Sequence, residues 1–281
     1  MFKIISKKVL GQNVKSFEIE APDVARNAKA GQFIMLRIDD KGERVPLTVA
    51  GTNIEKGLVR IIFQEAGKTT YELGTLNEGD SIKDFVGPLG HPTEIENYGT
   101  VAAVAGGVGT AEVLPVMQSL KKAGNKVIGI IGARNKDLII LEDELKPVCD
   151  ELIFATDDGS YGVKGLVTDI LKEVVNRETV NIIYAIGPVP MMRAVSNLTT
   201  EKNIRTLVSL NPIMVDGTGM CGACRVTVDG KTKFACVDGP EFDAHKVNWA
   251  ELISRLSLFR DLEKVSFDNF KHNPECKCRK E

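Results

Sequence analysis

The sequence lacks several features that would place it at once in a common class of protein. Its net charge is −2, so it has no basic excess of the kind that binds nucleic acid. No apolar run approaches the roughly 18 residues of a membrane-spanning helix. The stretch Met1–Lys8 has too few apolar residues for a signal peptide. These absences favour a cytoplasmic globular protein, and 281 residues suffice for two domains and a small third.

A disulfide scaffold is also absent. Five of the six cysteines lie in the C-terminal quarter, at short spacings typical of metal sites in a reduced protein. Cys221 and Cys224 form a C-x2-C pair, and Cys236 follows twelve residues later. Asp216 precedes the pair by five residues. On the residues alone, zinc and an iron–sulfur cluster both remain open. Asp216 is then either a ligand or only a turn residue, and His245 is a candidate fourth ligand for zinc.

Short apolar or alternating segments dominate up to about residue 95, and Pro, Gly, Asn and Asp separate them. Several short strands with turn signals between them predict a small antiparallel barrel. A helical turn is expected only at Thr69–Leu76. The expected strands are Ser16–Glu20, Phe33–Ile38, Leu47–Gly51, Leu58–Gln64 and Ser81–Val86.

From Thr100 the pattern changes to apolar strands that alternate with helix-like segments. This alternation predicts a doubly wound parallel sheet with helices on its faces. The expected strands are Val101–Ala105, Val127–Gly132, Leu152–Thr156, Ile182–Ile186 and Thr206–Leu210. The expected helices are Thr110–Ala123, Lys164–Val175 and Met191–Glu201.

The cysteine-rich segment contains a hairpin signal. Arg225–Val228 and Thr232–Ala235 are strand-like, and Asp229-Gly230 lies between them, a dipeptide that favours a tight turn. Such a hairpin would bring Cys236 back beside Cys224. The expected division of the chain is therefore a barrel at 1–97, an α/β domain at 98–210, a metal module at 211–245 and a helical tail at 246–281. Helix is expected in that tail from Val247 through Phe259. The tail ends in the charged segment Lys271–Glu281, where Cys276 and Cys278 are candidates for metal binding but a solvated end is favoured.

A glycine-rich turn joins the first strand of the α/β domain to its first helix. Gly106, Gly107 and Gly109 leave room for a pyrophosphate beside backbone N–H groups, and Thr110 opens the helix. Any tight strand-to-helix turn also favours glycine. The pattern is G-G-x-G and not the G-x-G-x-x-G of Rossmann dehydrogenases.

Two further loops lie at the carboxyl ends of strands in the same sheet, where open α/β sheets bind ligands. One contains Asp157 and Asp158, and the other contains Gly187, Pro188 and Met191. A carboxylate here would accept hydrogen bonds from ribose and repel a 2′-phosphate, which favours NAD over NADP. The alternative is an ordinary polar turn.

In the barrel half, two segments are candidates for anion binding. Arg44, Pro46, Leu47 and Thr48 open a strand, and Gly67, Lys68, Thr69 and Thr70 open a short helix. A helix N-terminus with an adjacent lysine is a plausible seat for an anion. On the residues alone, a surface arginine and an ordinary helix cap remain the simpler interpretation.

Taken together, these motifs resemble ferredoxin–NADP reductase-like flavoproteins, which carry them in the same order. The resemblance covers residues 1 to about 245 and includes a fifth motif, Gly87-Pro88-Leu89-Gly90. It implies that the Arg44–Thr48 segment contacts flavin and its phosphate and that the Gly67–Thr70 loop holds the pyrophosphate of FAD. It also implies that the glycine turn and the Gly187–Met191 loop bind NAD(H).

The cysteine module narrows the resemblance. A reductase of this kind with a [2Fe–2S] module looks like the electron-transfer subunit of dihydroorotate dehydrogenase B, where four cysteines hold the cluster. This chain has Asp216 at the first cysteine position. In that respect it is similar to the small (alpha) subunits of NADH-dependent reduced ferredoxin:NADP oxidoreductase. The resemblance therefore implies Asp216, Cys221, Cys224 and Cys236 as ligands.

The function that the resemblance implies is hydride exchange between NAD(H) and flavin, followed by single-electron transfer through the [2Fe–2S] cluster. The implied partner is a larger flavin and [4Fe–4S] subunit, in a heterodimer that serves ferredoxin by electron bifurcation. One alternative is the dihydroorotate dehydrogenase B subunit. Another, of a different class, is a zinc-stabilised nucleotide-binding regulatory module without redox activity.

Overall fold

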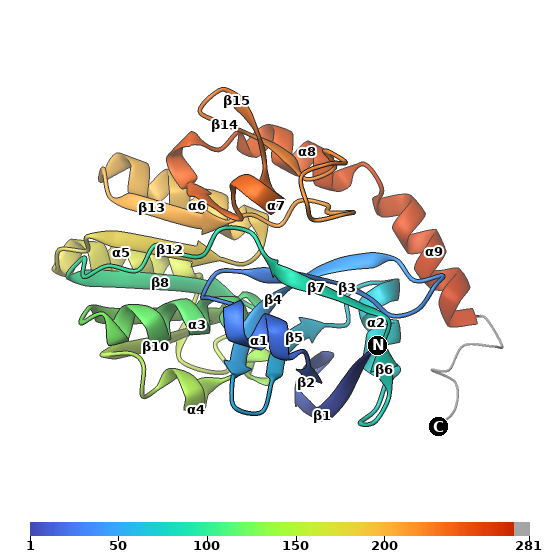
Figure 1. Ribbon diagram of the computed structural model, residues 1–281. Helices are drawn as coiled ribbons and strands as arrows, with labels where there is room; N and C mark the ends of the chain where they lie inside the picture. The colour runs from blue at the N-terminus through green and yellow to red at the C-terminus, as the bar shows by residue number, and fades with distance from the viewer. Residues whose placement is uncertain (273–281) are drawn as a thin grey trace.

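The computed structural model describes residues 1–272, which fold into an antiparallel barrel, a parallel α/β sheet and a cysteine-containing module (Figure 1). Cys276 and Cys278 lie outside the described residues. Within those residues, no helix combines the length and apolar character that crossing a membrane requires.

The N-terminal sheet has the strand order β6-β1-β2-β5-β4-β3-β7, and every pairing in it is antiparallel. It curls into the predicted barrel around a core in which the rings of Phe17 and Phe63 meet edge to face, with centroids 5.1 Å apart. The strands are β1 (Phe2–Gly11), β2 (Val14–Glu20), β3 (Phe33–Arg37), β4 (Arg44–Asn53), β5 (Leu58–Gln64), β6 (Ser81–Ile82) and β7 (Asp84–Leu89), and the helices are α1 (Pro22–Asn27) and α2 (Lys68–Thr75).

The second sheet has the order β11-β10-β9-β8-β12-β13-β16, and all of its strands are parallel except β16. Helices α3 and α4 cover one face, and α5 and α6 cover the other. The strands are β8 (Thr100–Gly106), β9 (Lys126–Ala133), β10 (Glu151–Thr156), β11 (Val163–Lys164), β12 (Ile182–Ile186), β13 (Arg205–Ser209) and β16 (Glu241–Asp243). The helices are α3 (Gly109–Lys122), η1 (Lys136–Leu138), α4 (Glu142–Leu145), α5 (Val167–Arg177), α6 (Val189–Glu201) and η2 (Ala244–Lys246).

The cysteine module packs onto the face of the sheet that α5 and α6 cover. Its hairpin of β14 (Arg225–Val228) and β15 (Lys231–Phe234) turns through Asp229 and Gly230, both at positive φ. Cys224 and Cys236 belong to the same hydrophobic core as residues of β8, β12 and α5. The module continues through α7 (Ala235–Asp238), α8 (Trp249–Ser257) and α9 (Arg260–His272).

Several element boundaries differ from the sequence-based expectation. Lys164 belongs to the short strand β11, and the helix that was expected to start there begins at Val167. Ala235 opens α7 rather than ending a strand, although its N–H still bonds across the hairpin to the carbonyl of Cys224 at 3.2 Å. The strand β16, within the expected metal module, pairs with β13 of the α/β sheet.

Besides β11, β16 and the short helices η1, α4, α7 and η2, the strand β1 and the helix α1 were not predicted, and α9 continues the expected helical tail beyond Phe259. In β1, Lys7 and Lys8 interrupt the apolar alternation, yet the ammonium of Lys7 reaches the carbonyls of Gly74 and Leu76 at 2.9 and 2.7 Å. Helix α1 is only six residues long. Helix α9 is charged and has no buried residue, so its sequence resembles a solvated tail. In Figure 1 it runs down the side of the barrel to α2, where it is held by tertiary contacts.

Candidate functional site

The buried part of the cysteine module is a pair of thiols. The Sγ atoms of Cys224 and Cys236 lie 3.2 Å apart, and both residues are 2% exposed. The β14–β15 hairpin produces this approach, because it pairs Arg225 with Phe234 next to the two cysteines. Burial, and then the neighbouring thiol, raise the pKa of Cys236 to about 12. A bound cation would be needed to hold both sulfurs as thiolates at neutral pH.

Asp216 and Cys221 form an exposed pair on the preceding loop. The Asp216 carboxylate accepts hydrogen bonds from the N–H of Cys221 at 2.8 Å and from the hydroxyl of Thr218 at 3.1 Å. The backbone N–H of Thr218, followed by smaller contributions from Cys221, lowers the pKa of Asp216 to about 2. Asp216 is therefore ionised at neutral pH and is placed beside Cys221. These contacts would also serve a simple turn.

Backbone N–H groups point at sulfur atoms in this loop. The N–H of Ala223 lies 3.5 Å from the sulfur of Cys221, and the N–H of Gly219 bonds to Cys236. Glycines at positive φ, among them Gly219 and Gly222, permit this path of the backbone. Hydrogen bonds to the sulfurs are a feature by which proteins tune iron–sulfur clusters. The donor set of the loop thus fits such a cluster.

A single metal ion fits the geometry less well. Among residues 1–272, no three His, Cys, Asp or Glu side chains converge on one metal position. Zinc takes about four ligands at one centre, whereas a two-iron cluster divides its ligands between two irons. The ring of His245, the candidate zinc ligand, instead hydrogen-bonds to the hydroxyl of Thr199 at 2.9 Å. Cys149 is partly buried, and burial raises the pKa of its thiol to about 12, as expected of a neutral cysteine.

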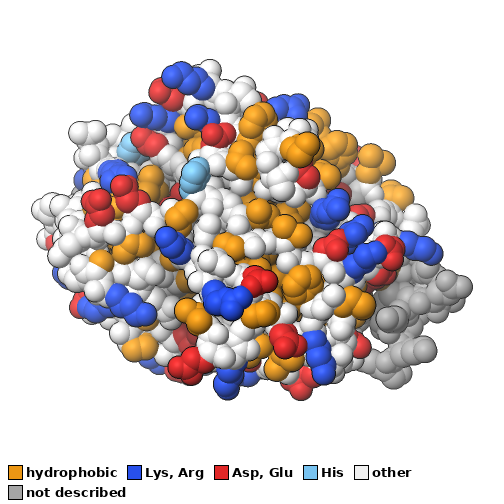
Figure 2. Space-filling model, in the orientation of Figure 1, with side chains coloured by type: hydrophobic (Ala, Val, Ile, Leu, Met, Phe, Trp, Pro, Cys, Tyr) orange, Lys and Arg blue, Asp and Glu red, His pale blue; other side chains and the backbone are white. Residues whose placement is uncertain are grey.

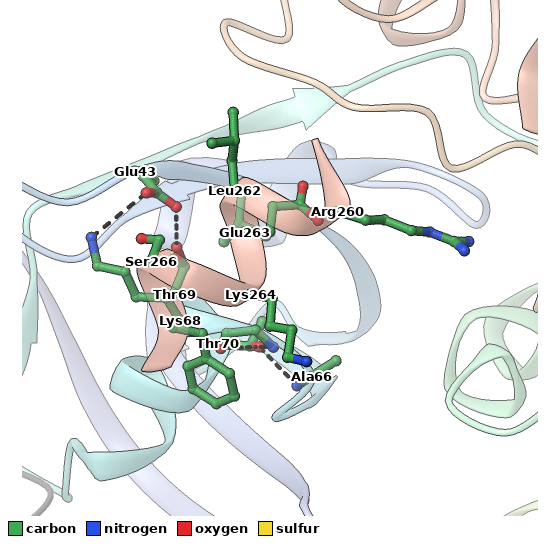
Figure 3. Close-up of a pocket in the computed structure, with 13 residues that line it drawn as sticks. Glu43, Ala66, Lys68, Thr69, Thr70, Arg260, Leu262, Glu263, Lys264 and Ser266 are labelled. Carbon is green, nitrogen blue, oxygen red and sulfur yellow. Dashed lines mark hydrogen bonds and ion pairs between the residues drawn. The ribbon is translucent and has the colours of Figure 1, made fainter. Parts of the chain in front are cut away.

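Three neighbouring cavities lie along the barrel and the carboxyl edge of the parallel sheet. The first, the helix-capped cavity, has a volume of about 770 Å³ and is lined by the Ala66–Thr70 loop and by α9 (Figure 3). The second, the central groove, has about 230 Å³ and lies between the barrel and α3. Ala66 and Thr70 line both of these. The third, the sheet-edge cavity, has about 590 Å³ and shares Gln64 and Val108 with the central groove.

The helix-capped cavity contains the predicted anion seat. Its lining includes Gly67, Lys68, Thr69 and Thr70. The Thr70 hydroxyl accepts hydrogen bonds from the N–H groups of Ala66 and Gly67, at 3.1 and 3.2 Å. The N–H groups of the first turn of α2 have no partner within that helix. A Cβ added to Gly67 would meet no atom within 4 Å, so the loop leaves open space above these donors.

The central groove contains three of the four residues predicted at the start of β4. Pro46, Leu47 and Thr48 line it, whereas Arg44 is exposed and lines none of the three cavities. Sequence reasoning missed Glu112 on α3, which faces the same groove and hydrogen-bonds to Thr48.

Glu112 lies in the first turn of α3, so the sequence alone suggests only an ordinary acidic residue at the start of a helix. Burial raises its pKa to about 7. Its side chain still has some accessible surface because it faces the groove.

The sheet-edge cavity brings together most of the predicted nucleotide site. Gly106, Gly107, Asp157, Pro188 and Met191 all line it. Gly107 has φ +57°, and a Cβ added there would meet nothing within 4 Å, so a ligand can approach the backbone closely.

Four predicted residues do not line the sheet-edge cavity. A Cβ on Gly109 would lie 2.4 Å from the carbonyl oxygen of Ile186, so that glycine permits close packing between α3 and β12. Thr110 is 1% exposed, and Gly187 packs against Gly106. Asp158 accepts a hydrogen bond from the N–H of Ser160 at 2.9 Å, and hydrogen bonds to Ser160 lower its pKa, as in the alternative of a polar turn.

The sheet-edge cavity also contains a cation that sequence reasoning missed. Arg134, just after β9, lines it together with Asp157 and is exposed. The signal was available, because Arg134 follows a strand whose carboxyl end reaches the same edge as those of β8 and β10.

Comparison with known proteins defines the class. Residues 103–197 match the family model of the oxidoreductase NAD-binding domain. Residues 211–248 match that of the iron-sulfur cluster binding domain of dihydroorotate dehydrogenase B. With the barrel, this makes the chain an NAD-binding oxidoreductase of the ferredoxin reductase-like type with a C-terminal iron–sulfur module, and that fold implies a flavin.

Closer relatives define the family. The chain is 50% identical over 268 residues to a Thermotoga maritima protein named as a homolog of the dihydroorotate dehydrogenase B (NAD(+)) electron transfer subunit, covering 95% of each chain. The dihydroorotate dehydrogenase B (NAD(+)) electron transfer subunit of Desulforamulus reducens is 31% identical to this chain. The alignment covers 88% of this chain and 97% of that subunit. The chain belongs to this family of electron-transfer subunits. A solved structure of NADH-dependent reduced ferredoxin-NADP oxidoreductase, from work on flavin-based electron bifurcation, matches with 49% identity and a TM-score of 0.91, covering 96% of this chain and 98% of that one.

Proposed function

We propose that this chain is the NAD(H)-linked subunit of an electron-bifurcating ferredoxin:NADP oxidoreductase and carries FAD and a [2Fe–2S] cluster. The observation that carries the proposal is Asp216, an ionised carboxylate beside Cys221 at the position where dihydroorotate dehydrogenase B subunits are expected to have a cysteine. The chain is 49% identical to the ferredoxin-NADP oxidoreductase chain and 50% identical to the dihydroorotate dehydrogenase B electron transfer subunit homolog, so overall identity does not separate the two functions and the proposal depends on Asp216.

The helix-capped cavity and the central groove together would hold FAD. The flavin ring fits the central groove beside Pro46, Leu47 and Thr48, and the diphosphate fits the helix-capped cavity. Thr70 lines both cavities, so one dinucleotide can pass around the Ala66–Thr70 loop. Arg44 remains a proposed phosphate contact on the resemblance alone.

The sheet-edge cavity would take NAD(H). Gly107 would admit the dinucleotide close to the backbone, and Asp157 would accept a hydrogen bond from a ribose hydroxyl. Gly106 also lines the cavity, but a Cβ there would lie 2.7 Å from the Met191 sulfur and 3.0 Å from Pro188, so this glycine lets the Gly187–Met191 loop pack against the glycine turn. Val108 lies where this cavity meets the central groove, so nicotinamide would face the flavin across that residue.

The four cluster ligands would divide into two pairs. Cys224 and Cys236 form the buried pair, and Asp216 and Cys221 form the exposed pair. Two observations support this pairing: the members of each pair are in contact, and no three such groups within residues 1–272 converge on one point. We propose that each pair binds one iron.

The proposed cluster site lies close to the central groove. The two are linked by β3 and by the loop after β13 that leads to Asp216. Phe33 lines the groove, and Met35 on the same strand would be 2.5 Å from a Cβ on Gly217. Met214, just before Asp216, also lines the groove. When bound, flavin exchanges a hydride with nicotinamide and single electrons with the cluster, and the protein positions these groups and tunes their potentials.

A larger partner subunit fits the surface beside the cluster site. Figure 2 shows hydrophobic side chains at the upper right, in the direction of α8 and α9. Met220 in the cluster loop is 89% exposed, and Leu258 and Phe259 at the end of α8 are 63% and 49% exposed. Exposed apolar groups that gather in this way are typical of protein–protein interfaces. We propose that this surface contacts a flavin and [4Fe–4S] subunit, in a heterodimer that serves ferredoxin.

Anaerobic purification from the native host tests the proposal. We expect about one FAD and about two iron ions per chain, visible flavin and iron–sulfur absorbance, and a copurifying larger flavoprotein with [4Fe–4S] clusters. A copurifying dihydroorotate-oxidising partner would instead identify the subunit of dihydroorotate dehydrogenase B. Zinc without flavin would identify a nucleotide-binding regulatory module.

A further inference from the structure

Helix α9 forms one wall of the helix-capped cavity. The cavity is lined on one side by Glu43, Val45 and the Ala66–Thr70 loop, and on the other by residues of α9 between Arg260 and Phe267. Figure 3 shows α9 passing over this loop. The anion seat at the start of α2 is therefore enclosed by a helix that lies almost two hundred residues later in the chain.

Helix α9 is attached to the barrel through a small cluster of one aromatic pair and one lysine. The ring of Phe267 meets that of Tyr71 on α2, with centroids 5.5 Å apart and planes at 67°. The ammonium of Lys271 lies 4.1 Å from the Phe267 centroid and 5.5 Å from that of Tyr71. Each such contact contributes only about 1 kcal/mol, and no residue of α9 is buried. Contacts within the described chain thus hold α9 weakly.

The charges around the cavity leave one cation directed at the anion seat. The ammonium of Lys68 lies 3.6 Å from the carboxylate of Glu43 and is partly neutralised by it. Figure 3 shows the side chain of Lys264, on α9, extended toward the Ala66–Thr70 loop. Among residues 1–272, no carboxylate lies within ion-pair distance of Lys264. A basic group without a carboxylate partner, facing free N–H groups across an open cavity, is suited to a polyanion.

We propose that α9 is a structural part of the dinucleotide site, with Lys264 binding the diphosphate of FAD against the first turn of α2. This inference rests on the proposed function, since it takes the helix-capped cavity as the diphosphate site. Phe267 then supplies the apolar wall beside Tyr71. Binding of the dinucleotide stabilises the docked position of α9, and α9 in turn slows release of the cofactor.

The test compares flavin binding by the full chain after its flavin has been removed. Dissociation constants for FAD and for riboflavin, which has no phosphate, are measured by flavin fluorescence. Lys264→Ala should weaken FAD binding about tenfold and leave riboflavin binding within about twofold, because a charge-assisted contact to phosphate is lost. Lys264→Arg should retain most of the FAD affinity.

Lys172→Ala is the matched control. Lys172 is exposed on α5 and lines none of the three cavities. Its removal changes the charge of the chain by the same amount as Lys264→Ala, and we expect FAD affinity within about twofold of that of the unaltered chain.

A second measurement uses the unaltered chain. FAD should slow tryptic cleavage within residues 260–272, and riboflavin should slow it much less. Equal FAD affinity for Lys264→Ala and the unaltered chain, an equal loss of riboflavin binding, or cleavage that FAD does not slow would each contradict the role of α9. If the unaltered chain binds no FAD at all, the proposed function fails as well, so the two failures are distinguishable.

Discussion

The sulfur atoms of Cys224 and Cys236 lie 3.2 Å apart, although twelve residues separate them in the sequence. The hairpin between them brings them together. Asp216 and Cys221 form a second contact on the loop just before this pair. This arrangement supports the proposed two-iron cluster, in which each pair of donors would hold one iron.

The substitution Asp216→Asn distinguishes two roles of Asp216, that of an iron ligand and that of a turn residue only. Asparagine can still accept hydrogen bonds from the N–H groups of Thr218 and Cys221, so the loop can keep its path. It lacks the negative charge that the proposed iron ligand would supply. We expect iron and acid-labile sulfide to fall below about half of the unaltered content, with an altered electron paramagnetic resonance spectrum in the remainder. Cys149→Ser, which changes a cysteine outside the site, should leave both unchanged. An unchanged iron content and spectrum in Asp216→Asn would remove Asp216 from the ligand set.

Asp157→Ala should relax the preference for NADH over NADPH. The carboxylate repels a 2′-phosphate, and Arg134 in the same cavity would attract it once Asp157 is gone. We expect the ratio of kcat/KM values for NADH and NADPH to fall about tenfold or more. Asp158→Ala is the matched control, because Asp158 bonds to Ser160 in its own turn. If the two variants shift the ratio equally, Asp157 does not select the cofactor.

Alanine substitutions at two glycines of the G-G-x-G turn should have different effects, one mainly on nucleotide binding and the other mainly on stability. Gly107→Ala places a methyl group in open space at φ +57°, so the cost to folding is about 1–2 kcal/mol and the main loss is nucleotide binding. Gly109→Ala places the methyl group 2.4 Å from the carbonyl oxygen of Ile186. We expect it to destabilise the fold by about 2–4 kcal/mol. Thermal unfolding and NADH titration check this contrast; if NADH affinity and stability change alike in both variants, the assignment of Gly107 to the site is wrong.

Glu112 should make stability depend on pH. Its pKa in the folded chain is about 7, above the usual 4.5, because burial disfavours the charged form. The folded state therefore binds more protons than the unfolded state between these values, and Glu112 costs stability as the pH rises through that window. Glu112→Gln should be nearly neutral at about pH 5 and stabilising by about 1–3 kcal/mol at about pH 8.

The measurement for Glu112→Gln is calorimetric unfolding at both pH values. Glu55→Gln, at an exposed position on the barrel, is the control and should show no pH-dependent difference. An equal effect of Glu112→Gln on stability at both pH values would show that burial does not raise the pKa of this carboxyl group.

The parts of the fold that local signals determine were predictable. The hairpin follows from Asp229-Gly230, because that dipeptide adopts the positive φ values of a tight turn. The glycine turn and the loops after β10 and β12 follow from the rule that ligands bind at the carboxyl ends of parallel strands.

Other features depend on contacts between distant residues and could not be predicted. Helix α9 looks like a solvated tail until Phe267 meets Tyr71, which lies on α2 in the barrel. Glu112 looks like a helix-start acid until the barrel supplies Thr48 and closes the groove over it. In both cases the role of the residue depends on contacts between segments that are distant in the sequence, and no local sequence pattern indicates those contacts.

The most direct test of the central claim is an anaerobic titration of the purified chain with NADH, followed by visible absorbance and electron paramagnetic resonance. We predict that NADH bleaches the flavin bands and that a reduced [2Fe–2S] signal appears with them. In Cys224→Ser the flavin should still bleach, and the cluster signal should be lost. An unaltered chain whose flavin is not reduced by NADH, or whose flavin is reduced while no cluster signal appears, would contradict the account.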